Sequence, residues 1–164
     1  MLWLPYYKLR FQTDLSLQSV IDRLLEVVEP EKSVGLRIKI RDFGHEKYLF
    51  DGKVTGHTFK ITRIIHYHNS FLPVISGGVT HDLNQTTVRL QFKLTYFMYI
   101  FILLFLVFDL IIISFFLYFY FTRNNSHYNL PVLIPIATLL FGYLMMIAGF
   151  GIEVNKAKKL LLKL

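Results

Sequence analysis

The sequence predicts an α+β soluble domain of one helix and about five antiparallel strands, fused to a two-helix transmembrane hairpin. The hairpin is predicted by two apolar segments, 94–122 and 130–152, which carry a single charge between them. Each exceeds the roughly 18 residues that a helix needs to cross a hydrocarbon core. The soluble domain is predicted from residues 1–93, where apolar spacing changes from a helical period to strict alternation. We therefore expect an integral membrane protein.

The predicted helix comes first in the soluble domain. Apolar residues recur three and four positions apart from Leu17 to Val28, which indicates one buried helix face. Thr13 or Asp14 is expected to cap the free amides at its start, and Pro30 to end it. No basic leader followed by an apolar core precedes this helix, so we expect no cleavable signal peptide.

The predicted strands follow this helix. In the first of them apolar residues alternate with Gly35, Arg37, Lys39 and Arg41, as in a half-buried strand. The candidate strands cover 34–41, 48–54, 58–67, 71–76 and 86–94. The turns expected between them are Asp51-Gly52, Gly56-His57, His68-Asn69, Gly77-Gly78 and Asn84-Gln85. We expect a curved sheet or open barrel whose last strand continues directly into the first membrane helix.

Basic residues near the two spans predict their orientation. Arg89 and Lys93 precede the first span, several lysines follow the second, and the connection 123–129 carries only Arg123. Lys and Arg in short flanking segments favour the cytoplasmic side, so both termini are expected in the cytoplasm and the loop 123–129 outside. This effect accounts for the flanking charge, and we expect no nucleic-acid partner despite the net charge of +7.

The segment 50–78 carries a resemblance to a known group. Its patterns F-x-G-x-V, F-x-I-x-R and N-S-F-L-P-V-I-x-G, followed by two spans and a short amphipathic tail, resemble an uncharacterised family of small bacterial two-span membrane proteins. The similarity extends to 141–161, but this chain has His68 where other members tend to carry Arg. A weaker similarity is to membrane proteins with a bacterial pleckstrin-homology-like domain. The resemblance implies this architecture in a bacterial inner membrane, and no reaction or cofactor.

Asp109 is the one charged residue in the predicted spans. A charge at mid-bilayer costs about 2.5–3.5 kcal/mol on insertion scales, so it is expected to face protein or water. Counting inward from the loop places it level with Gly142 and Tyr143, whose hydroxyl is a candidate donor; burial also favours a neutral carboxyl. Three hypotheses remain open: a hydrogen bond within the hairpin, a contact with another subunit, and a proton relay. A relay normally needs a second ionisable group, which the spans lack.

Small and basic residues supply the other candidate contacts. Thr138, Gly142 and Gly149 on the second span allow close packing of membrane helices, with Asp109 and Tyr143 beside them. The candidates for contact with a partner or with anionic headgroups are Arg37, Lys39, Arg41, Lys156, Lys158 and Lys159. The basic tail 153–164 is expected either to lie on lipid headgroups or to pack on the soluble domain.

Signatures of catalysis are weak throughout. The chain has no cysteine, no P-loop, no nucleophile elbow and no dinucleotide fingerprint. His66 and His68 share a strand face, but lack the further ligands that zinc needs, so we interpret them as surface residues. The sequence predicts a non-catalytic protein without a cofactor, which acts as a membrane-anchored binding or accessory subunit of a larger complex. The alternative is an effector whose soluble domain senses a signal and whose hairpins multimerise to permeabilise the membrane.

Overall fold

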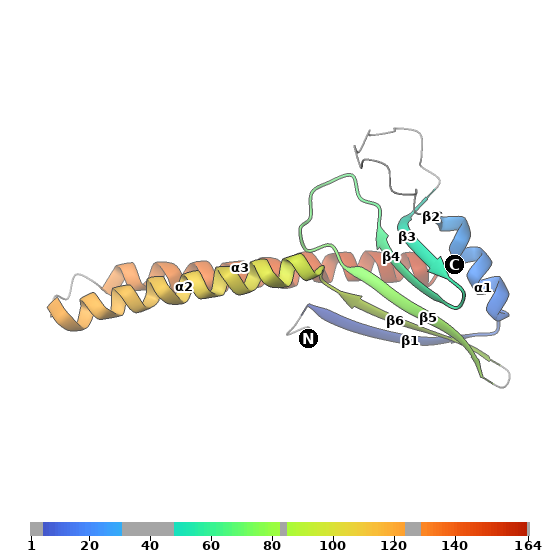
Figure 1. Ribbon diagram of the computed structural model, residues 1–164, viewed down its shortest axis with the longest axis horizontal. Coiled ribbons are helices and arrows are strands. Elements are labelled where there is room, and N and C mark those ends of the chain that lie inside the picture. The colour runs from blue at the N-terminus through green and yellow to red at the C-terminus, as the bar shows by residue number, and fades with distance from the viewer. Residues whose placement is uncertain (1–4, 31–47, 83–84, 124–128, 164) are drawn as a thin grey trace.

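The computed structural model describes residues 5–30, 48–82, 85–123 and 129–163, and it joins a six-stranded sheet to two long helices (Figure 1). The elements are β1 (Tyr6–Thr13), α1 (Leu17–Val27), β2 (Val28–Pro30), β3 (Phe50–Thr55), β4 (Thr58–Arg63), β5 (Val74–Asp82), β6 (Gln85–Lys93), α2 (Tyr96–Arg123) and α3 (Asn129–Leu161). The α+β class is confirmed, and α2 and α3 are long and apolar enough to cross a membrane.

The sheet has the order β1-β6-β5-β4-β3-β2. All neighbours are antiparallel except β2 and β3, which run parallel. The first strand therefore pairs with the last, and β6 is held on both sides just before the chain enters α2 at Tyr96. This arrangement confirms that the last strand leads directly into the first long helix.

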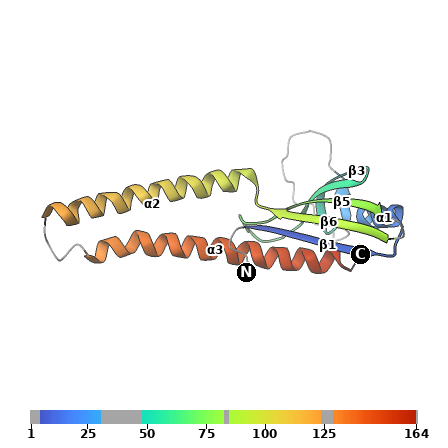
Figure 2. The same cartoon turned by 90° about the horizontal axis from the view of Figure 1, so that it is seen from below.

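One face of the sheet is covered by α1 and by the last turns of α3 (Figure 2). Alternate residues on the strands, such as Ile61, Ile75 and Phe92, form the buried layer. Facing them on α3 is a stripe of buried residues, Phe150, Val154, Ala157 and Leu161. Full burial of a side chain as large as Val or Phe is worth about 1.5–3 kcal/mol, so this stripe anchors α3 firmly to the sheet.

The predicted tail 153–164 is therefore not a separate segment. Residues 153–161 are the last turns of α3, and of the two alternatives the structure favours packing on the soluble domain over lying on headgroups. The apolar residues of this region recur three and four positions apart, so they lie on one side of the helix and pack against the apolar layer of the sheet. The lysines lie on the other sides of the helix.

Several expectations for the first half of the chain were wrong. The sequence prediction missed β1, although Tyr7, Leu9 and Phe11 alternate as in a half-buried strand, and it missed the short β2. The helix begins after Ser16, whose hydroxyl accepts a hydrogen bond from the Ser19 amide at 3.1 Å. Thr13 ends β1 instead of capping the helix.

Two of the predicted turns are also corrected. Asp51-Gly52 lies within β3 and Gly77-Gly78 within β5, which extends to Asp82. A side chain at Gly77 would overlap the ring of Phe59 on β4, so this glycine makes room on the sheet and does not end a strand. Gly56-His57 does form the turn between β3 and β4, with Gly56 at a φ of +55°. The predicted strand 34–41, with Arg37, Lys39 and Arg41, lies outside the described residues.

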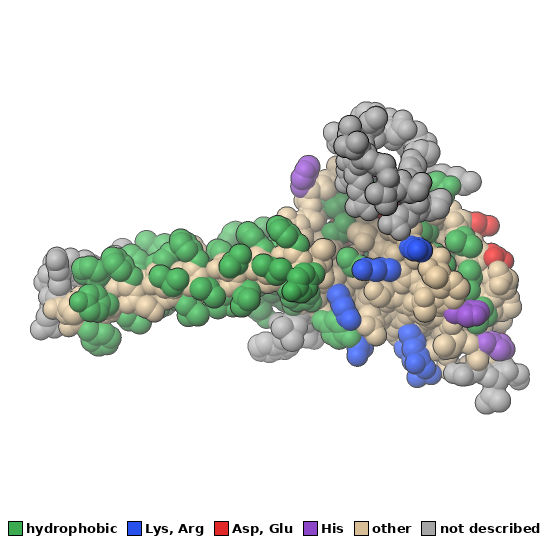
Figure 3. All heavy atoms as spheres, in the orientation of Figure 1, with side chains coloured by type: hydrophobic (Ala, Val, Ile, Leu, Met, Phe, Trp, Pro, Cys, Tyr) green, Lys and Arg blue, Asp and Glu red, His purple; other side chains and the backbone are tan. Residues whose placement is uncertain are grey.

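The helix α2 and the first part of α3 run side by side away from the sheet, and no other described element covers this hairpin (Figures 1 and 2). Apolar side chains coat the face that Figure 3 shows. Only 6% of the most apolar part of α2 is buried, whereas the core helix of a soluble protein is mostly buried. The apolar segments predicted at 94–122 and 130–152 thus belong to longer helices. By length and composition the candidate spans are Tyr96–Phe119 and Leu133–Leu161, but from Phe150 onward α3 packs on the sheet.

Candidate functional site at the junction of sheet and hairpin

Glu153 is a fully buried carboxylate on α3, where the helix passes from the hairpin to the sheet. Arg63, the last residue of β4, donates to its Oε2 from Nε at 2.9 Å and from Nη2 at 2.6 Å. The Tyr67 hydroxyl donates to the other oxygen, Oε1. Both carboxylate oxygens are therefore bonded, as a buried charge requires.

Tyr67 links this ion pair to a second cation. Its hydroxyl oxygen accepts from Arg63 Nη2 at 2.5 Å and from Lys156 Nζ at 3.0 Å, while its single proton goes to Glu153. A phenol has one donor and two acceptor positions, so the hydroxyl is fully used. Lys156 also lies 3.7 Å from Glu153 Oε1. We call Arg63, Tyr67, Glu153 and Lys156 the junction cluster.

The charges of the junction cluster shift two pKa values in opposite directions. Burial raises the pKa of Glu153, but the hydrogen bonds from Tyr67 and Arg63 and the charges of Arg63 and Lys156 outweigh it, so this pKa is lower than usual. The hydrogen bond to Tyr67 is the main reason that the pKa of Lys156 is raised. Both shifts favour the charged forms at neutral pH.

A second contact holds the same face of α3 one turn earlier. The Asn69 side-chain amide donates to the Gly149 carbonyl at 3.3 Å, and Asn69 Oδ1 accepts from the Phe71 amide at 2.9 Å. A side chain at Gly149 would press on the ring of Phe71. Gly149 thus lets the connection between β4 and β5 approach α3, and the space beside it is taken by Phe71 and Asn69.

Asp109 is buried between α2 and α3 and is 3% exposed. Thr138 Oγ1 lies 3.5 Å from Asp109 Oδ1, but it also donates to the Pro135 carbonyl at 2.9 Å. One hydroxyl proton cannot serve both acceptors fully, so the contact with Asp109 is the weaker one. Among the described residues Asp109 Oδ2 has no hydrogen-bond partner.

The depth predicted for Asp109 differs from the observed one by about a turn. Asp109 lies opposite Thr138, and Gly142 lies against Phe105, one turn further along. The predicted depth of Asp109 was counted from the loop 123–129, as if α2 and α3 met this loop at the same level. In the structure the two helices are displaced relative to each other along their axes. Tyr143 is more than a turn beyond Thr138. Thr138 and Gly142 thus lie on the side of α3 that faces α2.

The outer face of the sheet is strongly basic. Residues that pair directly across the sheet share a face, and Phe92, Ile75 and Ile61 define the inner one. The outward cations, all exposed, are Lys8, Arg10, Lys53, Lys60, Arg89 and Lys93. Among the described outward side chains those of Asp51 and its cross-strand partner Glu29 are acidic, at the β2–β3 edge of the sheet. Figure 3 shows Lys and Arg gathered over this face, which we call the basic face.

Sequence reasoning found neither the junction cluster nor the basic face. Two signals were available for the cluster, because Glu153 is the only acid in a basic tail and Arg63 ends the F-x-I-x-R pattern. The basic face depends on the register of β1, which was not predicted. Lys158 lies near the Tyr7 ring, 5.9 Å from its centroid, and Lys159 is exposed.

The comparisons with known proteins add no family. No family model, curated protein or solved structure matches the chain. The resemblance to small bacterial two-span membrane proteins and to pleckstrin-homology-like domains stays a prediction. Within the described ranges, no three His, Asp or Glu side chains are placed to hold a metal ion. The class that the fold defines is an α+β domain built onto two long apolar helices.

Proposed function

We propose that this protein is a non-catalytic, membrane-anchored binding or accessory subunit of a larger complex. One observation carries the proposal: α3 is both the second helix of the apolar hairpin and part of the core of the sheet domain. A partner bound to the sheet is therefore held at a fixed distance and angle from the bilayer. A domain on a flexible linker cannot impose such a geometry.

The junction cluster supports a rigid connection. Its ion pair joins β4 to α3 inside the protein, where solvent screens charges weakly. Every polar atom of the Glu153 carboxylate is bonded, and the nearby Asn69–Gly149 contact holds the same helix face. Such a saturated arrangement leaves no reactive group free for catalysis, so its role is to fix the orientation of the two parts.

The basic face supplies the surface for the proposed partner. It carries six cations against two described carboxylates, Asp51 and Glu29, so it is complementary to an acidic protein surface. The hairpin would lie in the bilayer of a bacterial inner membrane, with both termini cytoplasmic, and contact other subunits or further copies through its exposed apolar sides. Lys156, Lys158 and Lys159 remain candidates for contact with anionic headgroups.

A mild-detergent pull-down with mass spectrometry tests this proposal. The full chain should co-purify with one partner at constant stoichiometry, and the double variant Lys8→Glu/Arg10→Glu should retain at least tenfold less of it. Lys159→Glu is the matched control, since this exposed cation lies on α3 and not on the basic face. A lone monomer with nothing attached would contradict the proposal, as would equal loss in the control.

The effector hypothesis remains the second candidate because of Asp109. Its Oδ2 has no partner among the described residues, and assembly of several hairpins can supply one. In that case forced oligomerisation of the sheet domain should depolarise cells, and Asp109→Leu should abolish the effect. Unchanged membrane potential on oligomerisation would exclude this function and leave the accessory subunit.

A further inference from the structure

The strand β1 forms a free edge of the sheet. It pairs with β6 on one side, and in the described part of the chain no strand pairs with its other side. Figure 1 shows β1 along the lower margin of the sheet, with no other described element beyond it. All eight residues of β1 keep a continuous register with β6, without a bulge or a proline. An edge strand of this length is a template for a further strand.

The backbone of β1 offers hydrogen-bonding groups at this edge. In an antiparallel pair every second residue directs its N–H and C=O groups to the partner strand, so the other residues of β1 direct theirs away from β6. The opposite edge of the sheet differs, because β2 has only three residues and ends at Pro30, which lacks an N–H group. An extended segment can therefore pair over several residues only at β1, among the described edges.

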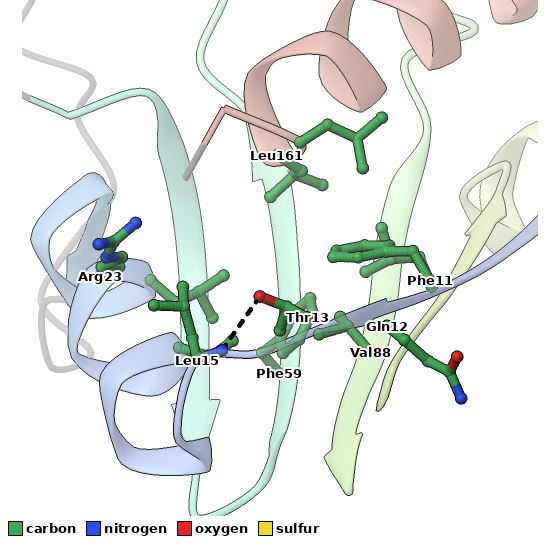
Figure 4. Close-up of a pocket in the computed structure, with 12 residues that line it drawn as sticks. Phe11, Gln12, Thr13, Leu15, Arg23, Phe59, Val88 and Leu161 are labelled. Atoms are coloured by element: carbon green, nitrogen blue, oxygen red, sulfur yellow. Dashed lines mark hydrogen bonds between the residues drawn. The ribbon is translucent and has the colours of Figure 1, made fainter. Parts of the chain in front are cut away.

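The inner side of β1 is apolar and incompletely covered. Its inward residues Tyr7, Leu9 and Phe11 are half-buried, whereas their direct partners on β6 are buried. Figure 4 shows Phe11 turned into a cavity of about 320 Å³ that it shares with Leu161 of α3, and Gln12 turned away from it. Apolar side chains at every second position of an added strand would extend this apolar layer.

The charged side chains of β1 and β6 are all positive, since neither strand contains an acidic residue. Lys8 and Arg10 are the outward cations of β1, and Arg89 lies directly opposite Arg10 on β6. On the inner side, Lys158 of α3 lies 5.9 Å from the centre of the Tyr7 ring. Like charges directly across a strand pair are unfavourable. An acidic side chain beside Arg10 would therefore relieve a repulsion that the fold already contains.

A second copy of this chain does not suit the edge. Two β1 strands placed side by side would bring Lys8 and Arg10 of one copy against the same cations of the other. The acidic edge of the sheet, with Asp51 and Glu29, offers only the three residues of β2 for pairing. Charged side chains on an edge strand typically prevent such pairing between copies. An acidic segment is not repelled in this way and is attracted by the same cations.

We propose that β1 binds an extended acidic segment of the partner protein as an additional strand, with acidic side chains on the outer side and apolar side chains on the inner side. The inference rests on the function proposed above, because it names the form in which the partner contacts the basic face. A segment of eight residues matches the length of β1. Backbone pairing supplies affinity in this mode of recognition, and the alternating side chains supply specificity.

Two synthetic peptides of equal composition test the proposal on the full chain in nanodiscs of zwitterionic phospholipid. One alternates glutamate and valine over eight residues, and the other carries the four glutamates first and the four valines after them. Fluorescence anisotropy should show at least tenfold tighter binding of the alternating peptide. Hydrogen–deuterium exchange in its presence should slow at least tenfold at amides within residues 6–13 and stay unchanged elsewhere.

Two double variants locate the site on the sheet. Lys8→Gln/Arg10→Gln should weaken binding of the alternating peptide at least tenfold. Lys53→Gln/Lys60→Gln is the matched control, since it removes as many cations from the same basic face, and it should weaken binding less than twofold. The strand β4 lies three strands from β1, or about 14 Å, which exceeds the Debye length of about 8 Å at 0.15 M salt.

Four results would overturn the proposal: no detectable binding, equal binding of the two peptides, protection outside residues 6–13, or equal loss in the two double variants. The pull-down separates this inference from the proposed function. If a partner co-purifies but leaves exchange in β1 unchanged, the accessory subunit stands and the added strand is refuted. If no partner co-purifies but the alternating peptide protects β1, the strand site stands and the accessory subunit is refuted.

Discussion

Both ends of α3 carry large apolar side chains, but in opposite surroundings. In the hairpin part, Leu140, Phe141 and Leu144 are exposed, whereas Phe150, Val154 and Leu161 are buried against the sheet. The junction cluster and Gly149 lie where α3 passes from the exposed hairpin to the core of the sheet domain. One helix thus serves two apolar environments, and its polar contacts at the junction cluster and Gly149 mark the border between them.

Phe150→Ala tests the difference between the buried and the exposed part of α3, with the largest effect that we expect. Phe150 is fully buried in the sheet core, so we expect a loss of about 3–5 kcal/mol in the free energy of unfolding of the sheet domain. Phe141→Ala, at 66% exposure in the hairpin, is the matched control and should change it by less than about 0.5 kcal/mol. Denaturant titration of the full chain in detergent measures both, and similar losses would refute the distinction.

Removing the charge of the junction cluster should have the next largest effect. Glu153→Gln weakens charge-assisted hydrogen bonds to Arg63 and Tyr67, each worth about 1.5–3 kcal/mol, and we expect a loss near that range. The same titration applies, with Glu26→Gln as control because Glu26 is exposed on α1. If Glu153→Gln left the free energy of unfolding unchanged, the cluster would not stabilise the junction.

The junction cluster also predicts a dependence on pH. The pKa of Glu153 is lower in the folded protein than its ordinary value of 4.5. Its contribution to stability is therefore complete above pH 4.5 and is lost as the pH falls through the folded pKa. We expect wild-type stability to fall more steeply than that of Glu153→Gln below pH 4.5. Parallel pH profiles of the two proteins would contradict the assignment.

The smallest expected effect is in the hairpin. Thr138→Val removes the weak 3.5 Å contact with Asp109, and hydrogen bonds between membrane helices average about 0.6 kcal/mol. Helix separation in lipid, measured by steric trapping, should become easier by no more than this. A much larger effect would mean that Asp109 depends on Thr138 more than the geometry indicates.

The sequence predicted the parts of the molecule whose signal is local. The two apolar helices follow from hydropathy, the Gly56-His57 turn from its residue types, and α1 from its periodicity. The Arg63–Glu153 pair joins residues ninety positions apart, and no local pattern encodes that contact. Gly77 shows the same limit: its role depends on Phe59 in the neighbouring strand, so the doublet Gly77-Gly78 was interpreted as a turn.

The central claim is that the sheet domain is fixed to α3, and a distance distribution tests it most directly. The chain has no cysteine, so Lys60→Cys and Lys159→Cys can carry spin labels at exposed positions of β4 and α3 without background. Pulsed electron paramagnetic resonance in nanodiscs should give one narrow distance. Glu153→Gln should broaden it. A broad distribution in the otherwise wild-type protein would show a loosely tethered domain and contradict the claim.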